Sequence, residues 1–370
     1  GIGVPEIIVP STGHAAFHKA AHYLGVKIVV TPVDRKTFKA DVEAVRAAIT
    51  ENTCLIVASA VSYPHGVIDP VEELAKLAAD NGVLCHVDGC MGGFVLPYFR
   101  RLGADVPAFD LSVPGVTSIS MDLHKFAYAA KGASVVLYNS SELRKHQFFT
   151  CAGWAGYTMI NATVQSSKSV GPLAAAWAVL NFVGDDGYLE YARGLLDATR
   201  RIVAGVRDIP GLRVLGEPDM NLVAFASDEI NVFHLIDEMN SRGWYIQPQL
   251  GHPDSPPNVH LSIAPANTRW VDELLADLRV CVDKVRGATS GPLVAMAQQA
   301  LAAIPDPSAI DGSMLKQLLS LAGIEGGGLP ERKADINELL NILPPAFKER
   351  LLLEFMSDLF TYKQPASSAS

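Results

Sequence analysis

The first 140 residues alternate short apolar runs with amphipathic segments, and this alternation limits the fold more than any other feature of the chain. The apolar runs are mostly β-branched and apolar on both sides, as in the strands of a buried parallel sheet. They lie at residues 7–9, 27–31, 55–60, 84–87, 116–120 and 133–138. Helical patterns lie between them at residues 14–24, 41–49 and 71–81. The alternation predicts an α/β domain with a mainly parallel sheet.

The sequence pattern changes in the rest of the chain, first to a long helical segment and then to a mixture of strands and helices. Residues 173–209 are helical in pattern with a break at 184–187, which suits a connection between a large and a small domain. Residues 212–285 follow the order strand, strand, helix, strand, helix, as in a compact α+β domain. Later residues are rich in Ala, Pro and Gly, with helical patterns at 336–342 and 346–360 and a tail that we expect to be disordered. We predict a large domain at 1–180, a smaller α+β domain at 181–290 and a helical extension at 291–370.

The composition argues against several classes of protein. The formal net charge is −9 and no basic run is longer than Arg100-Arg101, so we expect no nucleic-acid partner. No apolar run reaches the roughly 18 residues of a membrane span, and nothing resembles a signal peptide. The five cysteines form no C-x-x-C pair, which predicts reduced thiols in a cytoplasmic protein. We expect no metal site.

Two residues that follow predicted strands carry groups for one kind of chemistry. Lys125 ends the segment DLHK at residues 122–125, after the run at 116–120, and Asp88 follows the run at 84–87. A lysine amine can condense with the aldehyde of pyridoxal phosphate (PLP), and a carboxylate can keep the ring nitrogen of that cofactor protonated. Ligand sites of open α/β sheets lie at the carboxyl ends of strands. The two residues therefore predict a PLP site at that edge.

Each candidate residue also has a structural interpretation. A lysine in mixed sequence is usually a solvated surface residue, and Asp88 before a glycine is typical of a turn. The glycines that follow Asp88 would also let a flat ring approach. His14 could cap a helix or stack on the cofactor ring, and Lys131 could lie in a plain turn or contact an anion. Apolar residues after Lys125 favour function, because burial disfavours the charged amine and makes it easier to deprotonate.

Together these segments resemble the group II PLP-dependent decarboxylase family and, within it, the sphingosine-1-phosphate lyases. Residues 14–20 (HAAFHKA) are similar to the family's His-x-x-x-x-Lys-Ala motif. Residues 86–94 (HVDGCMGGF) are similar to its pyridine-nitrogen aspartate motif in the lyase version. Residues 118–134 (SISMDLHKFAYAAKGAS) resemble the Schiff-base segment of the lyases. Shorter similarities are PHGVIDP at 64–70 and QFF at 147–149.

This resemblance, which covers about residues 4 to 287, implies a fold-type I, aminotransferase-like homodimer with active sites at the subunit interface. It implies that Lys125 is the Schiff-base lysine and that Asp88 is the partner of the pyridinium nitrogen. By the same resemblance His14 stacks on the ring, His124 lies near the cofactor phosphate, and Lys131 lies near the phosphate of the substrate.

The sequence departs from the family in three places. The family's Gly-Thr-Glu-Ser phosphate cup should precede Ile7, so we expect the chain to lack the N-terminal part of the family's domain and to bind PLP weakly when alone. Met159 and residues 164–169 replace a tyrosine and an Ala-Gly-Ser-Arg-Pro-Gly segment expected after Trp154, and Tyr157 lies two positions from the place of that tyrosine. The residues after Ala300 do not match the lyases.

The resemblance implies a PLP-dependent carbon–carbon lyase. Its substrate would be sphingosine 1-phosphate or another phosphorylated sphingoid base, cleaved by a retro-aldol reaction to a fatty aldehyde and phosphoethanolamine. The residue that takes the C3 hydroxyl proton is not identifiable, although Tyr157 is a candidate proton carrier. The alternatives are an amino-acid decarboxylase of the same family and a catalytically silent partner subunit.

Overall fold

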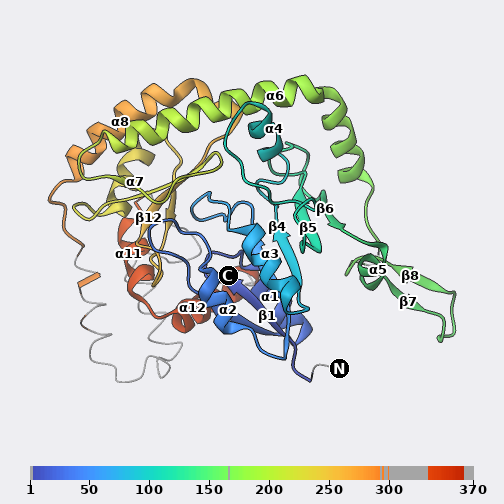
Figure 1. Ribbon diagram of the computed structural model, residues 1–370. Coiled ribbons are helices and arrows are strands. Elements are labelled where there is room, and N and C mark those ends of the chain that lie inside the picture. The colour runs from blue at the N-terminus through green and yellow to red at the C-terminus, as the bar shows by residue number, and fades with distance from the viewer. Residues whose placement is uncertain (1–2, 166, 292–293, 296–298, 300–331, 362–370) are drawn as a thin grey trace, which may run out of the picture. The chain divides into compact units, whose positions relative to one another are not determined.

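The computed structural model describes residues 3–165, 167–291, 294–295, 299 and 332–361 (Figure 1). These residues form two compact units. Unit 1 contains the chain up to Phe225 together with Pro253–Ser255 and His260–Leu275. Unit 2 contains Ala226–His252, Pro256–Val259 and the residues from Ala276 onward. The domain limits at residues 180 and 290 stay a proposal.

Unit 1 is built on a six-stranded sheet of order β2-β1-β3-β4-β5-β6. The first five strands pair in parallel and β6 pairs antiparallel with β5, which confirms the predicted mainly parallel sheet. The strands are β1 (Glu6–Pro10), β2 (Lys27–Thr31), β3 (Thr53–Ser59), β4 (Leu84–Asp88), β5 (Ser118–Asp122) and β6 (Ser134–Tyr138).

Burial explains why the central strands look apolar on both sides. Ile56, Val57 and Ala58 on β3 have no exposed surface, although they point alternately to opposite faces of the sheet. The edge strand β6 is mostly exposed. The connecting helices are α1 (Ala16–Leu24), α2 (Val42–Ala48) and α3 (Val71–Asp80). The core of unit 1 therefore lies around β1, β3 and β4.

Local sequence sets the ends of these helices. The Asp41 carboxylate accepts hydrogen bonds from the Glu43 and Ala44 backbone N–H groups and caps α2. Helix α3 begins after Pro70 and ends before Gly82, whose φ of 67° is favourable for glycine. Helix α3 packs against β3 and β4 through fully buried side chains such as Leu74. These caps confirm the start and stop signals of the sequence.

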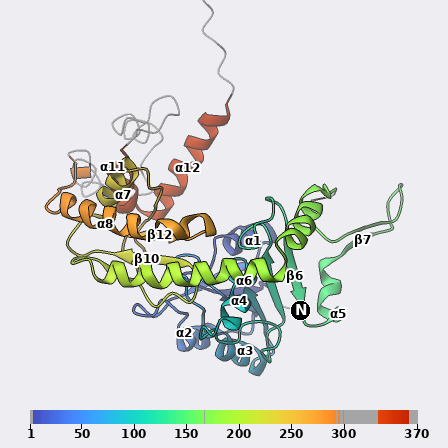
Figure 2. The same cartoon turned by 90° about the horizontal axis from the view of Figure 1, so that it is seen from above.

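A 37-residue helix, α6 (Gly171–Arg207), follows a projecting hairpin. Gly184 interrupts α6 with φ 63° and ψ 175°, so the predicted break falls on this residue, and Figure 1 shows α6 in two segments that meet at a bend. The hairpin of β7 (Phe149–Cys151) and β8 (Met159–Asn161) extends away from the six-stranded sheet (Figure 2). We did not predict this hairpin, because no alternating pattern marks its three-residue strands.

A second sheet has the order β11-β12-β10-β9. Its strands are β9 (Arg213–Val214), β10 (Leu222–Ala226), β11 (Gln247–Gln249) and β12 (Asn258–Ser262). The remaining helices are α4 (Leu96–Arg101), α5 (Ser141–Arg144), η1 (Lys145–Gln147), α7 (Val232–Ser241), η2 (Pro265–Trp270), α8 (Val271–Val285), α11 (Ala334–Ile342) and α12 (Pro345–Phe360). The predicted helices at 336–342 and 346–360 are confirmed, and the predicted disordered tail lies outside the described residues. Among the described residues, no helix combines the length and apolarity that crossing a membrane requires.

The parallel strands place their carboxyl ends along one edge of the six-stranded sheet. Strand β1 ends at Pro10, β4 at Asp88 and β5 at Asp122. Because β4 and β5 are neighbours, with Asp88 beside Ser120 in the register, the segments that follow them start side by side. This edge is where the candidate site lies.

Candidate active site

Asp88 is held at the end of β4 by two hydrogen bonds. Its side chain is buried, with 8% of the residue exposed. The Cys90 backbone N–H (3.0 Å) and the Ser120 hydroxyl (3.3 Å) both donate to Oδ1. The carboxylate is therefore fixed in direction at the strand end, as the sequence predicted for the partner of a ring nitrogen.

A network on one face of β4 and β5 supports Asp88, and we did not predict it. His86 Nδ1 lies 2.8 Å from the Ser118 hydroxyl, and Nε2 lies 3.3 Å from the Ser120 hydroxyl that also bonds Asp88. Burial lowers the pKa of His86, while the nearby Asp88 charge opposes this shift. The signal was present in the sequence, because H-x-D and S-x-S place alternate side chains on one face of neighbouring strands.

Lys125 lies in a tight turn directly after β5. Its backbone N–H donates to the Asp122 carbonyl (3.2 Å), and its carbonyl accepts from the Tyr128 N–H (3.0 Å). The Lys125 Nζ lies 3.0 Å from Asp122 Oδ2, and 25% of the lysine side chain is exposed. The turn thus presents a primary amine beside a carboxylate at the same sheet edge as Asp88.

The neighbours of Lys125 set its proton affinity. Burial acts to lower the pKa of the amine, but Cys90 and Asp122 outweigh burial and raise the pKa above its usual value. Burial also raises the pKa of the Cys90 thiol to about 12, so this group is neutral at physiological pH. Asp122 is then the anion that stabilises the charged lysine. The expectation that Lys125 is easier to deprotonate is wrong, because the sequence reasoning considered burial without this ion pair.

His124 is fixed beside the same carboxylate. Its Nδ1–H donates to the Ala133 carbonyl at 2.8 Å, and its Nε2 lies 3.6 Å from Asp122 Oδ2. Burial opposes ionisation of Asp122, but hydrogen bonds from Ser134 and Lys125 lower the pKa of its carboxyl group. His124 and Lys125 therefore lie on the same carboxylate, that of Asp122.

A buried tyrosine ties the lysine turn to α6. The Tyr188 hydroxyl donates to the Ala127 carbonyl at 2.7 Å, two residues after Lys125. The Tyr188 ring also packs edge-on against Phe94, with centroids 4.7 Å apart. The sequence analysis missed this contact, because the two segments are 61 positions apart.

His14 lies in the turn that follows β1 and is exposed. Its Nδ1 accepts a hydrogen bond from the Ala16 N–H at 3.1 Å, so His14 contacts the first residue of α1 from one position before the N-cap residue Ala15. Three residues later the Phe17 ring contacts the His86 ring, with centroids 6.0 Å apart, so the start of α1 lies near β4. The turn therefore reaches the Asp88 edge of the sheet, and stacking of His14 on a cofactor stays a proposal.

Lys131 and Tyr157 do not join this cluster. Lys131 is exposed, and within the described residues it forms no hydrogen bond or ion pair. Tyr157 lies at the turn of the β7–β8 hairpin with 68% of its surface exposed, and its ring packs against Trp154. A substrate-phosphate contact by Lys131 stays a proposal, and no contact in the described structure supports Tyr157 as a proton carrier at this site.

The glycines after Asp88 have a packing role that we did not predict, and the approach of a flat ring beside them stays a proposal. A Cβ atom on Gly89 would lie 2.8 Å from the Ser120 carbonyl oxygen, and one on Gly93 would lie 2.7 Å from the Gly89 oxygen. A Cβ on Gly92 would lie 2.5 Å from the Ala60 carbonyl oxygen. Small residues are therefore needed here because backbone segments pack closely around these three positions.

Comparison with protein families gives two matches. The model described as "Pyridoxal-dependent decarboxylase conserved domain" matches residues 5–228, which include all five predicted site residues. The model described as "Pyridoxal-dependent enzyme, C-terminal putative HTH domain" matches residues 295–358. The second match covers the segment that did not resemble the lyases.

Curated relatives carry the name sphingosine-1-phosphate lyase. The protein from Arabidopsis thaliana is 45% identical over 293 residues, which are 79% of this chain and 53% of that protein. The protein from Dictyostelium discoideum is 45% identical over 282 residues, which are 76% of this chain and 52% of that protein. The chain thus spans about half the length of the curated relatives it matches.

Solved structures share the fold. A sphingosine-1-phosphate lyase from Burkholderia pseudomallei has a TM-score of 0.74 and 39% identity, covering 83% of this chain and 69% of that chain. A glutamate decarboxylase from Lactobacillus brevis has a TM-score of 0.68 at 18% identity, covering 78% of this chain and 68% of that chain. The predicted fold-type I architecture is confirmed.

Proposed function

Since the chain belongs to the pyridoxal-dependent decarboxylase family, we propose that it carries the cofactor-binding and reacting groups of a carbon–carbon lyase for phosphorylated sphingoid bases. The observation that carries the proposal is the placing of Asp88 and Lys125 at adjoining strand ends, in segments that match the lyase pattern. The predicted products are a fatty aldehyde and phosphoethanolamine.

The side chains at this edge fit pyridoxal phosphate, the cofactor of the family. A fixed, buried carboxylate (Asp88) and a partly exposed primary amine (Lys125) are the two groups that the cofactor needs. When bound, the cofactor supplies an electron sink for charge released at the substrate carbon. Lys125 would hold it covalently through Nζ, Asp88 would meet its ring nitrogen, His14 would lie against the ring, and His124 would contact its phosphate.

The residues of this chain control protons at two positions. Asp88 would keep a proton on the ring nitrogen of the cofactor, and the Ser120 and Cys90 hydrogen bonds hold its Oδ1 in place for that task. Asp122 stabilises the charged form of the Lys125 amine, so Lys125 could hold a proton at Nζ close to the substrate amine.

Lys131 separates the lyase from an amino-acid decarboxylase of the same family. In the lyase reading its ammonium group contacts the substrate phosphate, and a charge-assisted hydrogen bond of about 1.5–3 kcal/mol corresponds to roughly tenfold or more in affinity. We expect Lys131→Ala to lower kcat/KM for sphingosine 1-phosphate by at least about tenfold. The unphosphorylated amine should be affected far less. The matched control is Lys145→Ala, another exposed lysine.

Equal losses on the phosphorylated and unphosphorylated substrates would contradict the phosphate contact and favour the decarboxylase. Turnover of an amino acid to carbon dioxide, with none of the phosphorylated base, would contradict the lyase itself.

We also infer a homodimer with active sites at the subunit interface, as the resemblance implies. Large apolar side chains are exposed on the β7–β8 hairpin and on the first half of α6, and exposed apolar patches of this kind mark protein interfaces. They include Phe149, Ile160, Trp177 and Phe182. The five cysteines are free, which supports the cytoplasmic location that we propose.

Nucleic-acid binding is not part of the proposal, although one family match names a helix-turn-helix domain. Residues 295–358 contain nine acidic and five basic residues. Binding to nucleic acid depends on basic side chains that neutralise phosphates. The charge of this segment therefore opposes such a contact.

A further inference from the structure

Three side chains of the kinds that bind metal ions lie together in unit 2. In the sequence they are far from the residues of the candidate active site. His234 on α7 and Asp335 and Glu338 on α11 each offer one ligand atom, and all three atoms lie within 4.8 Å of one another. We propose that these three side chains bind a divalent transition-metal ion of the zinc class that joins α11 to α7.

The spacing of the atoms fits a shared ion. His234 Nε2 lies 2.9 Å from Glu338 Oε1. Tetrahedral ligands at about 2.0–2.2 Å from one zinc ion are roughly 3.3–3.6 Å apart, so the two atoms need to separate by only about 0.5 Å to share an ion. Neither atom has a hydrogen-bond partner among the described residues, so their close approach lacks the direction of a hydrogen bond. His234 Nε2 and Glu338 Oε1 can therefore each direct a lone pair at a shared metal ion.

The burial and the charge of these side chains also favour a bound cation. Glu338 is 6% exposed, so an unpaired carboxylate oxygen at this place is costly. Asp335 and Glu338 are three residues apart on one helix, where like charges repel each other. A single protonated His234 offsets only one of the two negative charges. A divalent cation offsets both and accepts imidazole and carboxylate ligands together.

Neighbouring contacts hold the ligands in place. The Ser290 hydroxyl donates to Glu338 Oε2 at 2.5 Å, which leaves Oε1 to face His234. The Asp237 carboxylate accepts from the Lys333 and Ala334 backbone N–H groups and caps α11. Bonds of this kind, made behind the ligands, orient metal-binding side chains. The nearby cations Lys284 and Arg332 pair with Glu238 instead of the cluster.

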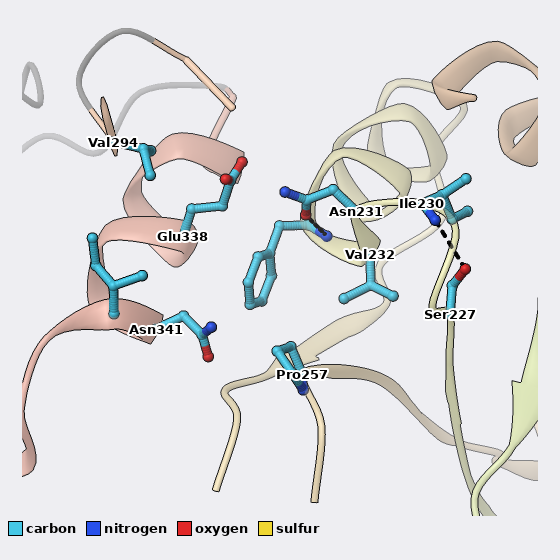
Figure 3. Close-up of a pocket in the computed structure, with 10 residues that line it drawn as sticks. Ser227, Ile230, Asn231, Val232, Pro257, Val294, Glu338 and Asn341 are labelled. Atoms are coloured by element: carbon cyan, nitrogen blue, oxygen red, sulfur yellow. Dashed lines mark hydrogen bonds between the residues drawn. The ribbon is translucent and has the colours of Figure 1, made fainter. Parts of the chain in front are cut away.

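A cavity of about 200 Å³ adjoins the cluster and shares Glu338 with it. Figure 3 shows Glu338 and Asn341 on one side of this cavity, with Asn231 and Val232 on the other. Its volume holds several waters, because one water occupies about 30 Å³ in the liquid. Three protein ligands leave at least one coordination position, and water from the cavity can fill it. No metal-binding motif marks these residues in the sequence, because His234 lies 101 and 104 positions before its partners.

The test is a titration of ZnCl₂ into the full chain, stripped of metals, in a phosphate-free buffer by calorimetry. We expect one saturating equivalent, with an affinity that falls by more than about tenfold in His234→Asn and in Glu338→Gln. The matched controls are His22→Asn and Glu349→Gln, which remove exposed side chains of the same types and should leave binding unchanged. Absence of saturable binding, or equal binding by the ligand variants, would overturn the proposal.

A second measurement does not depend on whether the variants fold. Co²⁺ bound to the wild-type chain should show d–d absorption bands typical of nitrogen and oxygen ligands. A strong thiolate-to-metal charge-transfer band would place the ion at a cysteine and overturn the proposal. Zn²⁺ should also raise the melting temperature of the wild type and of Glu349→Gln, because an ion that binds only the folded state stabilises it.

Discussion

Asp122 stabilises the charged form of the candidate catalytic lysine. It lies 3.0 Å from the Lys125 amine and raises the pKa of that amine, together with Cys90 and against the effect of burial. A lysine must be neutral to attack an aldehyde. In the free chain Lys125 is therefore protonated, and its amine must lose a proton before it can attack the aldehyde of the cofactor.

Replacing Asp122 tests this account. The raised lysine pKa means that the charged amine persists to higher pH than in an unpaired lysine. In Asp122→Asn the pKa should fall, and at pH 8 Lys125 should react with an aldehyde several-fold faster. The measurement is the pH profile of borohydride trapping of a simple aldehyde, with Glu142→Gln as the control for loss of an exposed carboxylate. An unchanged profile would mean that Asp122 does not set the lysine charge.

The positions of the two proposed reacting groups could be predicted from the sequence, and the groups that contact them could not. Asp88 and Lys125 follow strands, so their position at one sheet edge could be predicted from chain order. The effect of Asp122 on the pKa of Lys125 could not be predicted, because it depends on how the turn after β5 directs the lysine side chain. The hydrogen bond from the Ser120 hydroxyl to Asp88 could not be predicted either, because it depends on the register of β4 against β5.

At the scale of elements, two buried histidines join the loop after β3 to the second sheet's β12. The His65 ring stacks on Phe38 with centroids 4.0 Å apart, and its Nε2 lies 3.0 Å from the Ser255 hydroxyl. His260 on β12 packs against Tyr63. Burial lowers the pKa of His65 to about 4, with a contribution from His260, and burial also lowers the pKa of His260 to about 4.

These shifts predict loss of stability in mild acid. A histidine with a depressed pKa contributes stability that is present above its unfolded value of 6.5 and lost as pH falls toward 4. The full shift corresponds to about 3 kcal/mol for each histidine. We expect the free energy of unfolding in urea to fall between pH 7 and pH 5, and less steeply in His65→Gln. His22→Gln, an exposed histidine, should keep the wild-type slope; an equal slope in all three would contradict this account.

Elements with strong patterns were predictable and short ones were not. The predicted strand at 27–31 and helix at 71–81 match the structure to within one residue, because an unbroken β-branched run marks the strand and clear start and stop signals mark the helix. Strands β7, β8 and β11 have three residues each, which is too short for a periodic pattern. Their pairing depends on contacts that no local sequence encodes.

At the scale of the whole molecule, exposed apolar side chains predict self-association. Trp177 is 69% exposed and Phe182 is 91% exposed on α6. We expect a solution mass of about twice the 39.6 kDa of the chain by sedimentation equilibrium. Phe182→Asp should shift the equilibrium toward monomer, because a charge in an apolar interface is costly. Tyr245→Asp, at another exposed aromatic residue, should not; a monomeric wild type would contradict the homodimer.

The covalent attachment of pyridoxal phosphate tests the central claim most directly. Lys125 is the amine that we assign to hold the cofactor, and Lys131 is a nearby lysine with a different proposed task. After incubation with pyridoxal phosphate and reduction with borohydride, peptide mass spectrometry should find the adduct on Lys125 in the wild type and in Lys131→Ala. The adduct should be absent in Lys125→Ala. A stoichiometric adduct that persists in Lys125→Ala, or that forms on another lysine of the wild type, would contradict the account.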